Sequence, residues 1–486
     1  MTTRQPAVRT LLLVTLLLAI AGDILLRVEP WGLNAPVVML LLIAAIGVVG
    51  RAMRDPLPLE AWLIAGFGLL TAACIAWRDA AELTAFDLLA TVAAIHLVTA
   101  RKRPGDTMRM AFVDHFVHLF TQMIHLAAGS FLLLLRDLHP GNGEGSMDRA
   151  RLGRIGLGIA LTIPAILVFG ALLTSADATF EYLITDILHL DIWTLIGHAA
   201  LIAFLAWTAG GWLRGRFLAS ESFSSPLLTG HRVSLGMTEL AILVGSLDLL
   251  FGVFVAIQIP HFFGGHAAIL DTPALTYAQY ARRGFFELIA VAALGVPLLL
   301  MVDWLYRGTE AHGRRIIRML SAVMIAFLGV MLASAMHRLF LYMEAYGLTA
   351  ARINAAAILI WISVTLVLFC FLVFRGKRQF LPFGIIVSGY LILLGLNAVN
   401  PDALVARVNM TRLAADGKFD PHYTFRLGAD AVPVLLNGMH ALTPEQRSTL
   451  ADRLLRSYTD STATADPRSW NAARATALRS AARRGG

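Results

Sequence analysis

Two charged side chains near the middle of the chain have the types and spacing of a ligand-binding pair. Arg283 and Glu287 begin an apolar stretch four residues apart, so they share one helical face and can pair. Gln258 ends the preceding apolar stretch, Tyr280 lies between the two, and Arg352 begins a later one. We interpret these five residues as a polar cluster that binds a small anionic ligand, a lipid headgroup or a protein partner. A structural ion-pair network is the alternative.

Two carboxylates lie within a single apolar stretch, where charge is expensive. Asp248 is near its middle and Glu239 near its start. A charge at mid-bilayer costs about 2.5–3.5 kcal/mol on insertion scales, so such groups usually face a partner or a cavity. The two residues are nine apart and project to opposite helical faces, which excludes one paired-carboxylate site. Either could be a proton-linked group of a transporter, and hydrogen-bonded helix packing is the simpler alternative.

Three histidines give the strongest metal-ligand pattern in the chain. His115, His118 and His125 share one face of a predicted helix, and neutral imidazoles on one face can hold a transition metal. No cysteine or carboxylate pattern accompanies them. We therefore interpret them as the polar stripe of a helix at the membrane interface, and we assign no metal and no cofactor. The common phosphate-loop, zinc-protease and serine-hydrolase signatures are absent as well, so no catalytic residue is assigned.

The elements that position these residues follow from composition. The chain of 486 residues is 57% hydrophobic and 15% charged, with mean hydropathy +0.70. The apolar residues come in blocks of about 20, the length of a spanning helix. The sequence therefore predicts an all-α polytopic transmembrane bundle of about eleven spans: Thr10–Leu26, Ala35–Val49, Leu57–Trp77, Leu83–Ala100, Ile155–Leu173, Ile192–Leu213, Met237–Gln258, Phe285–Trp304, Met319–Met336, Ala355–Phe374 and Leu381–Val399.

Basic residues predict the orientation of these spans. Arg and Lys cluster at alternate segment ends, and all of these clusters fall on one side if the N-terminus is cytoplasmic. An odd number of spans then puts the C-terminal tail outside the cytoplasm, in a multi-pass protein of the bacterial inner membrane. No basic surface interleaved with aromatic residues predicts nucleic-acid binding. Membrane lipids, and a protein bound through the tail, are the expected partners.

Four regions follow along the chain. Residues 1–104 hold the first four spans, and 105–154 form a cytoplasmic-side segment with one amphipathic interfacial helix. Residues 155–399 form a central seven-helix membrane domain. Residues 400–486 are polar and form a small helical tail domain, whose capping box Thr443-Pro-Glu-Gln446 opens a helix.

Several strings resemble a bacterial membrane family. They are Tyr277-Ala-Gln-Tyr-Ala-Arg-Arg-Gly-Phe-Phe-Glu287, Gln258-Ile-Pro-His-Phe-Phe-Gly-Gly265, Leu172-Leu-Thr-Ser-Ala-Asp-Ala-Thr-Phe180, Gly347-Leu-Thr-Ala-Ala-Arg352, Asn400-Pro-Asp-Ala-Leu-Val-Ala-Arg-Val-Asn409 and Leu427-Gly-Ala-Asp-Ala-Val-Pro-Val-Leu435. Together they resemble domain-of-unknown-function family 4173 from about Leu57 onward. His261 departs from the aromatic residue expected there. The resemblance implies a membrane architecture and points to Gln258–Glu287, without a substrate.

Three functions are compatible with these patterns. The leading one is a non-enzymatic membrane protein whose outer polar cluster binds a ligand, lipid or partner. The second is a proton-coupled secondary transporter using Asp248 or Glu287. The third, and weakest, is an intramembrane enzyme acting on lipid-borne substrates. A polar path between both membrane faces would favour the transporter, and a cluster open on one face would favour the binding protein.

Overall fold

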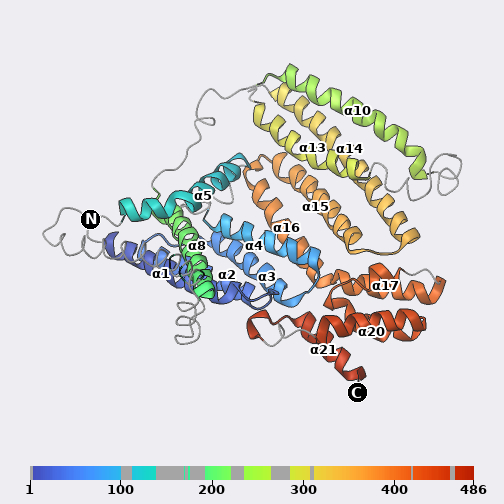
Figure 1. Cartoon of the computed structure of the whole chain (residues 1–486). Coiled ribbons are helices and arrows are strands. Elements are labelled where there is room, and N and C mark those ends of the chain that lie inside the picture. Colours follow the sequence, from blue (N-terminus) through green and yellow to red (C-terminus); the bar gives the residue numbers. More distant parts are fainter. Residues whose placement is uncertain are drawn as a thin grey trace.

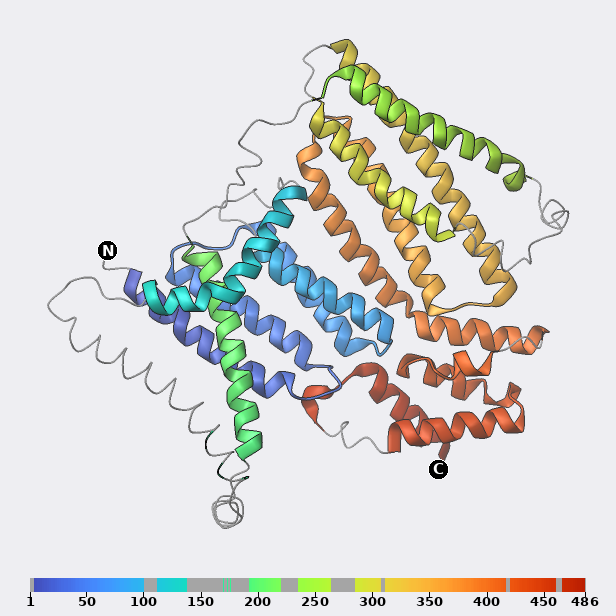
Figure 2. The ribbon, with the colours of Figure 1, turned by 45° about the horizontal axis from the view of Figure 1, so that its top comes forward.

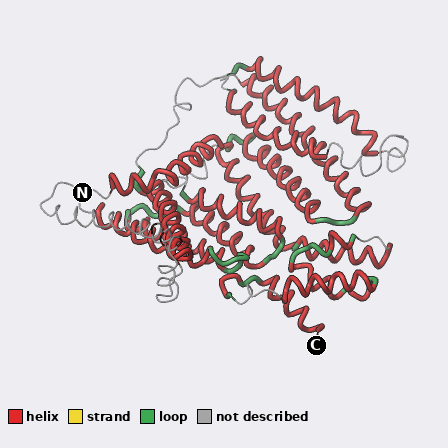
Figure 3. Tube along the Cα trace, viewed as in Figure 1, coloured by secondary structure: helices red, strands yellow, loops and turns green. Residues whose placement is uncertain are grey.

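The computed structural model describes residues 4–99, 112–137, 192–219, 235–263, 285–306, 311–416, 420–459 and 466–485, with positions 169, 173 and 175. Within these residues every regular element is helical, apart from one isolated bridge between Leu235 and Tyr306 (Figure 3). The predicted all-α class is confirmed.

The helices form two groups that meet at one helix (Figures 1 and 2). The first group comprises α1 (Arg4–Leu26), α2 (Asn34–Ala52), α3 (Leu59–Trp77), α4 (Ala81–Val98), α5 (Phe112–Leu132) and α8 (Ile192–Phe217). The second comprises α10 (Met237–Phe263), α13 (Phe285–Leu305), α14 (Ala311–Tyr346), α15 (Ala350–Val373) and α16 (Leu381–Val399). Leu381 belongs to the core of the second group and Tyr390 to the core of the first, so α16 joins them.

The predicted spans agree well with these helices. Nine helices among the described residues are long and apolar enough to cross a membrane, and each overlaps a predicted span. The predicted span Phe285–Trp304 corresponds to α13, a helix of 21 residues that contains Pro297. The predicted span Ile155–Leu173 lies almost entirely outside the described residues. The chain is thus a polytopic helical membrane protein.

One helix is much longer than its predicted span. We expected Met319–Met336, whereas α14 has 36 residues and is about 54 Å long at 1.5 Å per residue. Its first turns carry Arg314, Arg315 and Arg318. These residues have no apolar pattern, but they continue the same helix beyond the hydrocarbon thickness.

The amphipathic helix predicted after the first four spans is α5. Its aromatic face points outward, since Phe116 and Phe120 are both about 70% exposed (70% and 69%). Its polar face turns inward: Gln122 is buried, and a Cβ on Gly129 would lie 2.8 Å from the backbone of Gly211 in α8. That distribution fits a helix whose aromatic side chains contact lipid.

We call residues 400–486 the tail, and the described part of it folds on one end of the bundle, the tail-side end (Figure 2). The tail contains α17 (Pro401–Asp416), α18 (Pro421–Thr424), α19 (Val432–Asn437), α20 (Pro444–Thr459) and α21 (Ala472–Gly485). Two small cores hold it together, one around Met410 and Leu435 and one around Leu436 and Ala477. The capping box is confirmed by reciprocal hydrogen bonds between Thr443 and Gln446.

The opposite end of the bundle, the far end, carries interhelical ion pairs. Arg216 of α8 donates to Asp55 after α2 (2.6 Å), and Arg378 donates to Asp303 of α13 (2.9 Å). The arginine clusters predicted to share one membrane side therefore include residues that tie neighbouring helices together. The boundaries proposed at residues 104, 154 and 399 remain predictions.

Candidate functional site

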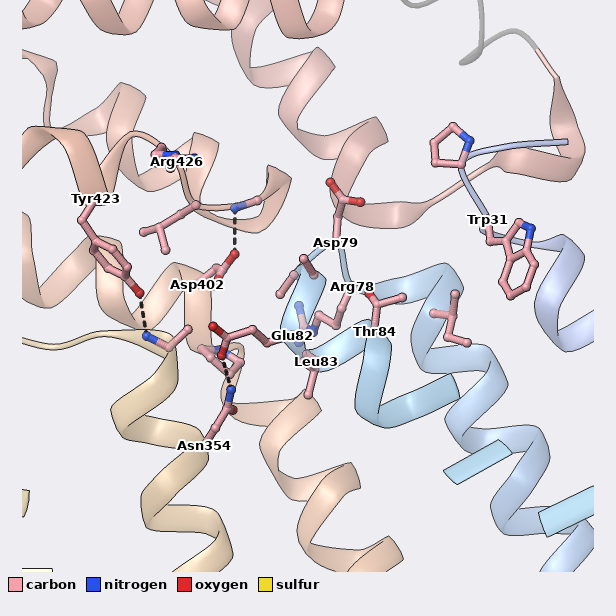
Figure 4. A pocket seen from close by; sticks show the side chains of 18 residues that line it. Trp31, Arg78, Asp79, Glu82, Leu83, Thr84, Asn354, Asp402, Tyr423 and Arg426 are labelled. Atoms are coloured by element: carbon pink, nitrogen blue, oxygen red, sulfur yellow. Dashed lines mark hydrogen bonds between the residues drawn. The ribbon is translucent and has the colours of Figure 1, made fainter. Parts of the chain in front are cut away.

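The candidate site is a pocket of about 620 Å³ between the tail-side end of the bundle and the tail. Its wall combines the α1–α2 link, the α3–α4 link, the start of α4, the start of α15, the start of α17 and the 423–428 segment, which includes the end of α18. Figure 4 shows Glu82, Asn354, Asp402 and Tyr423 lining it from four separate segments. A pocket of this size can hold a small molecule.

One buried carboxylate attaches the tail beside this pocket. Asp430 accepts hydrogen bonds from Arg78 Nη1 (3.1 Å), from the backbone N–H of Asp79 (2.7 Å) and from Asn400 Nδ2 (2.9 Å). Arg78 also donates to the carbonyl of Asn397 at the end of α16 (2.8 Å). The link between α3 and α4, the end of α16 and the tail are therefore held by one charged network.

Side chains of the tail also cap the helices of the bundle. The last carbonyls of a helix lack intrahelical partners. Asn471 donates to the carbonyls of Ile75 (2.9 Å) and Arg78 (2.8 Å) at the end of α3. Arg468 donates to Ile24 of α1 (2.6 Å), and Arg412 donates to the last turn of α14. The tail is thus part of the membrane domain's structure and positions one wall of the pocket.

The carboxylates of the pocket are held by specific donors. Asn354 Nδ2 donates to Glu82 Oε2 (2.5 Å), and the backbone N–H of Gly428 donates to Asp402 Oδ2 (2.7 Å) (Figure 4). Burial raises the pKa of Asp402 to about 6, because desolvation disfavours the carboxylate and nearby Asp430, Glu82 and Asp79 add like charge. The cavity therefore concentrates negative charge that water only partly solvates.

The pKa of Asp79, like that of Asp402, lies above its ordinary value. Its pKa is raised by burial, although Arg474 and the N–H of Ala429 partly stabilise its charge. Tyr423 completes this wall: its hydroxyl accepts the backbone N–H of Ala350 at the start of α15 (2.7 Å). This contact fixes the 423–428 segment against the membrane helices.

A second, smaller pocket of about 300 Å³ adjoins the first. Asp79, Arg426 and Gly428 line both. Arg453 of α20 and Arg474 of α21 line only the smaller one, so three arginines face one carboxylate there. The two pockets share a wall and carry opposite charge excess.

The family model for a domain of unknown function (DUF4153) matches residues 65–438. The chain belongs to this family. The family number expected from the sequence strings, 4173, is not confirmed. Searches of curated proteins and of solved structures returned no match. The DUF4153 region contains the walls of the larger pocket from Ile75 to Gly428, whereas Arg453 and Arg474 follow it in the tail.

The polar cluster predicted from the sequence is only partly visible. The side chains of Gln258, Tyr280 and Arg283 lie outside the described residues, and Glu287 is exposed at the start of α13. Arg352 donates to the carbonyl of Gly347 and stacks over the ring of Tyr342, 4.1 Å from its centroid. Arg352 is therefore held locally, and convergence of the five residues stays a prediction.

The two carboxylates of α10 differ in exposure, as their spacing along the helix predicts. Glu239 is exposed in the first turn, whereas Asp248 is 7% exposed. Neither carboxylate oxygen of Asp248 has a hydrogen-bond partner among the described residues. Asp248 is buried whereas Glu239 is exposed on the same helix, so the two do not form one site.

Two of the three histidines of α5, His115 and His118, lie against His96 near the end of α4, whereas His125 faces α8, where a Cβ on Gly215 would lie 2.9 Å from its ring. The ring of His118 lies 4.8 Å from that of His96, centroid to centroid. Within the part of the chain that the structure describes, no three His, Cys, Asp or Glu side chains gather closely enough to hold a metal ion. His115, His118 and His125 thus have the position of a helix-packing stripe.

Sequence reasoning missed the pocket because its carboxylates are far apart along the chain. Asp79 and Glu82 flank the short link before α4, and Asp402 follows α16 some 320 residues later. A signal was available: the strings beginning at Asn400 and at Leu427 contain Asp402 and Asp430. What the sequence did not contain was the contact between these strings and the α3–α4 link.

Proposed function

We propose that this integral membrane protein binds a small, positively charged ligand in the larger pocket between bundle and tail. The observation that carries the proposal is the convergence of Asp79, Glu82 and Asp402, from two regions of the chain, on one cavity of about 620 Å³. A bound cation offsets the desolvation of these carboxylates, because an opposite charge nearby favours the ionised form.

An orphaned amide supports the presence of a ligand. Asn354 is 7% exposed, and its Nδ2 donates a hydrogen bond to Glu82. Its Oδ1 is buried without a hydrogen-bond partner among the described residues. A buried acceptor left without a donor costs about 1–3 kcal/mol. An ammonium group in the pocket could donate to this oxygen and to Glu82 together.

The proposed charge preference differs from the one we expected from the sequence. The predicted cluster around Arg283 and Arg352 favoured an anion, whereas the larger pocket carries an acidic excess. With the N-terminus in the cytoplasm, as the arginine pattern predicts, this pocket opens on the extracytoplasmic side of a bacterial inner membrane. We further propose that its role is binding, without chemical turnover.

The proposal is tested by titrating ethanolamine into the purified full-length protein in phosphatidylcholine nanodiscs. We expect saturable binding that Glu82→Gln and Asp402→Asn each weaken at least tenfold. Asp452→Asn is the matched control, because Asp452 is exposed on α20 and lines neither pocket. Absence of binding, or equal weakening by Asp452→Asn, would contradict the proposal.

A second candidate function is proton-coupled transport. It is favoured by two buried carboxylates in the membrane helices. Asp87 of α4 is fully buried and accepts from Asn397 Nδ2 (2.9 Å), but its second oxygen has no partner among the described residues. Neither carboxylate oxygen of Asp248 has a hydrogen-bond partner among the described residues. If these groups carry protons, Asp87→Asn and Asp248→Asn abolish substrate-driven proton uptake in proteoliposomes and leave ethanolamine binding in nanodiscs intact.

A further inference from the structure

We infer that Asp87 and Asn397 form a reversible proton-binding site inside the bundle, in which Asp87 carries a proton on Oδ2 and donates it to Oδ1 of Asn397. This proton fastens α4 to α16, the helix that joins the two helix groups. The inference goes beyond cation binding in the larger pocket and does not depend on it. It assigns one pair of residues to the proton of the second candidate function.

The first argument is the complete burial of both side chains. Asp87 lies in the first half of α4 and Asn397 near the end of α16, and each has 0% of its surface exposed. Asn397 Nδ2 donates to Asp87 Oδ1 (2.9 Å), but a neutral amide supplies no positive charge. A carboxyl group buried without a cation neutralises itself by taking up a proton, because the desolvated charge is too costly.

The second argument is the pair of oxygens that this contact leaves over. Among the described residues, Asp87 Oδ2 and Asn397 Oδ1 are both buried without a hydrogen-bond partner. An ionised carboxylate only accepts hydrogen bonds, whereas a protonated carboxyl also has one O–H donor. One proton on Asp87 therefore turns two unsatisfied acceptors into a donor and an acceptor.

The third argument is that the neighbouring polar hydrogens already have acceptors. Asn397 Nδ2 also donates to a backbone carbonyl of its own helix (3.0 Å). The hydroxyl of Thr91 lies 2.8 Å from the carbonyl oxygen of Asp87 and 2.9 Å from the hydroxyl of Thr71. The hydroxyl of Tyr390 donates to a backbone carbonyl of α4 (2.7 Å). The donor that Asn397 Oδ1 lacks is thus best supplied by the carboxyl of Asp87 itself.

The titratable and charged groups near Asp87 do not replace this proton. Cys74 of α3 lies close by, but its thiol makes no hydrogen bond with Asp87 Oδ2. Arg78, at the end of α3, is paired with a carboxylate of the tail (3.1 Å). Glu82, five residues earlier on α4, accepts from an amide of α15 (2.5 Å), and Tyr390 of α16 is engaged as described. The carboxyl of Asp87 thus has no cation partner among the described residues.

Loss of the proton would change the contact between α4 and α16. A carboxylate oxygen and an amide carbonyl oxygen repel each other, and the repulsion is strong in a low-dielectric interior. The same two segments continue into the larger pocket, because Leu83 and Thr84 of α4 and Pro401 after α16 line it. Proton binding by Asp87 therefore holds two walls of this pocket together.

The first test is infrared difference spectroscopy of the full-length protein at neutral pH in dodecyl maltoside, a detergent without a carbonyl group. A protonated carboxyl gives a C=O stretching band that an ionised carboxylate lacks, and we expect Asp87→Asn to remove such a band. Asp23→Asn is the matched control. Asp23 is also buried in a membrane helix (4% exposed), but it is paired with Arg27 (2.7 Å) and His198 (2.5 Å), so its replacement should leave the band. A band that survives Asp87→Asn overturns the inference.

The second test is the pH dependence of the apparent melting temperature. The amide introduced by Asp87→Asn can donate to Asn397 Oδ1 and accept from Nδ2, so this variant keeps both hydrogen bonds at every pH. Stability that depends on protonated Asp87 is present at low pH and is lost as pH rises. We therefore expect the melting temperature of the unmodified protein to fall more steeply with rising pH than that of Asp87→Asn. Asp402 titrates in both proteins, so its effect cancels in the comparison.

A third variant separates hydrogen bonding from packing. Asp87→Leu fills a similar volume without a polar atom and should melt below Asp87→Asn at every pH. Parallel pH profiles for Asp87→Asn and the unmodified protein would overturn the reversible binding of a proton. Ethanolamine takes part in none of these measurements, so failure of the cation proposal and failure of this inference are distinguishable.

Discussion

Removal of the Asp430 carboxylate should release the tail from the membrane bundle. Asp430 is 8% exposed and accepts from Arg78, from the backbone of Asp79 and from Asn400. Asp430→Ala leaves the Arg78 guanidinium, whose side chain is only 12% exposed, without its carboxylate. Breaking a buried ion pair by removing one partner costs about 3–5 kcal/mol.

This loss should be measurable as local opening. If the tail detaches as a unit, 3 kcal/mol increases its open population by about two orders of magnitude, since each 1.4 kcal/mol is tenfold. Cleavage of a transiently open segment follows that population when reclosing is fast. We therefore expect trypsin to cleave after Arg474, whose side chain donates to the carbonyl of Trp31 (2.6 Å), at least about 100-fold faster in Asp430→Ala than in the unmodified protein.

Two variants make the experiment decisive. Asp452→Ala removes an exposed carboxylate of α20 and should change the cleavage rate less than twofold. Asp430→Asn keeps one acceptor oxygen, so its cleavage rate should lie between those of Asp430→Ala and Asp452→Ala. Docking of the tail through Asp430 is refuted if Asp430→Ala and Asp452→Ala are cleaved at the same rate while both retain the helical content of the unmodified protein.

Three further predictions concern pH and close packing. Folding raises the pKa of Asp402 from 3.8 to about 6, so the stability contributed by its protonated form is complete below pH 3.8 and is lost as pH rises through 6. We expect the free energy of unfolding of Asp402→Asn, relative to that of the unmodified protein, to increase by up to about 3 kcal/mol between pH 4 and pH 8, measured by denaturant unfolding. A Cβ on Gly428 would lie 1.7 Å from a backbone oxygen of the α3–α4 link, so Gly428→Ala should expose the tail to trypsin, whereas Gly395→Ala, with open space around it, should not. A Cβ on Gly211 would lie 2.2 Å from a carbonyl of α5, so Gly211→Ala should lower the apparent melting temperature in detergent and Gly245→Ala, which meets nothing within 4 Å, should leave it unchanged.

The membrane architecture was predictable because it depends on local composition. A run of about 20 apolar residues satisfies its backbone as a helix and its side chains in lipid, wherever it occurs in the chain. The spans therefore overlapped the observed helices. The ends of α14 were missed because its charged first turns lack apolar residues and yet continue the same helix.

Single-helix properties were also predictable. The face of α5 that carries His118 and Gln122 packs inward and the face that carries Phe116 and Phe120 points outward, because side-chain direction along a helix follows from spacing alone. The opposite exposure of Glu239 and Asp248 has the same origin.

Only the tertiary structure brought the pocket together. Glu82 and Asp402 are 320 residues apart, and their convergence depends on how α16 passes between the two helix groups and how Asp430 fixes the tail to the α3–α4 link. Sequence spacing carries no information on such contacts, because they depend on which helices pack side by side. By itself the sequence determined a polytopic helical membrane protein with charged residues near its helix ends. The packing decided that an acidic and an arginine-lined cavity adjoin beneath the tail.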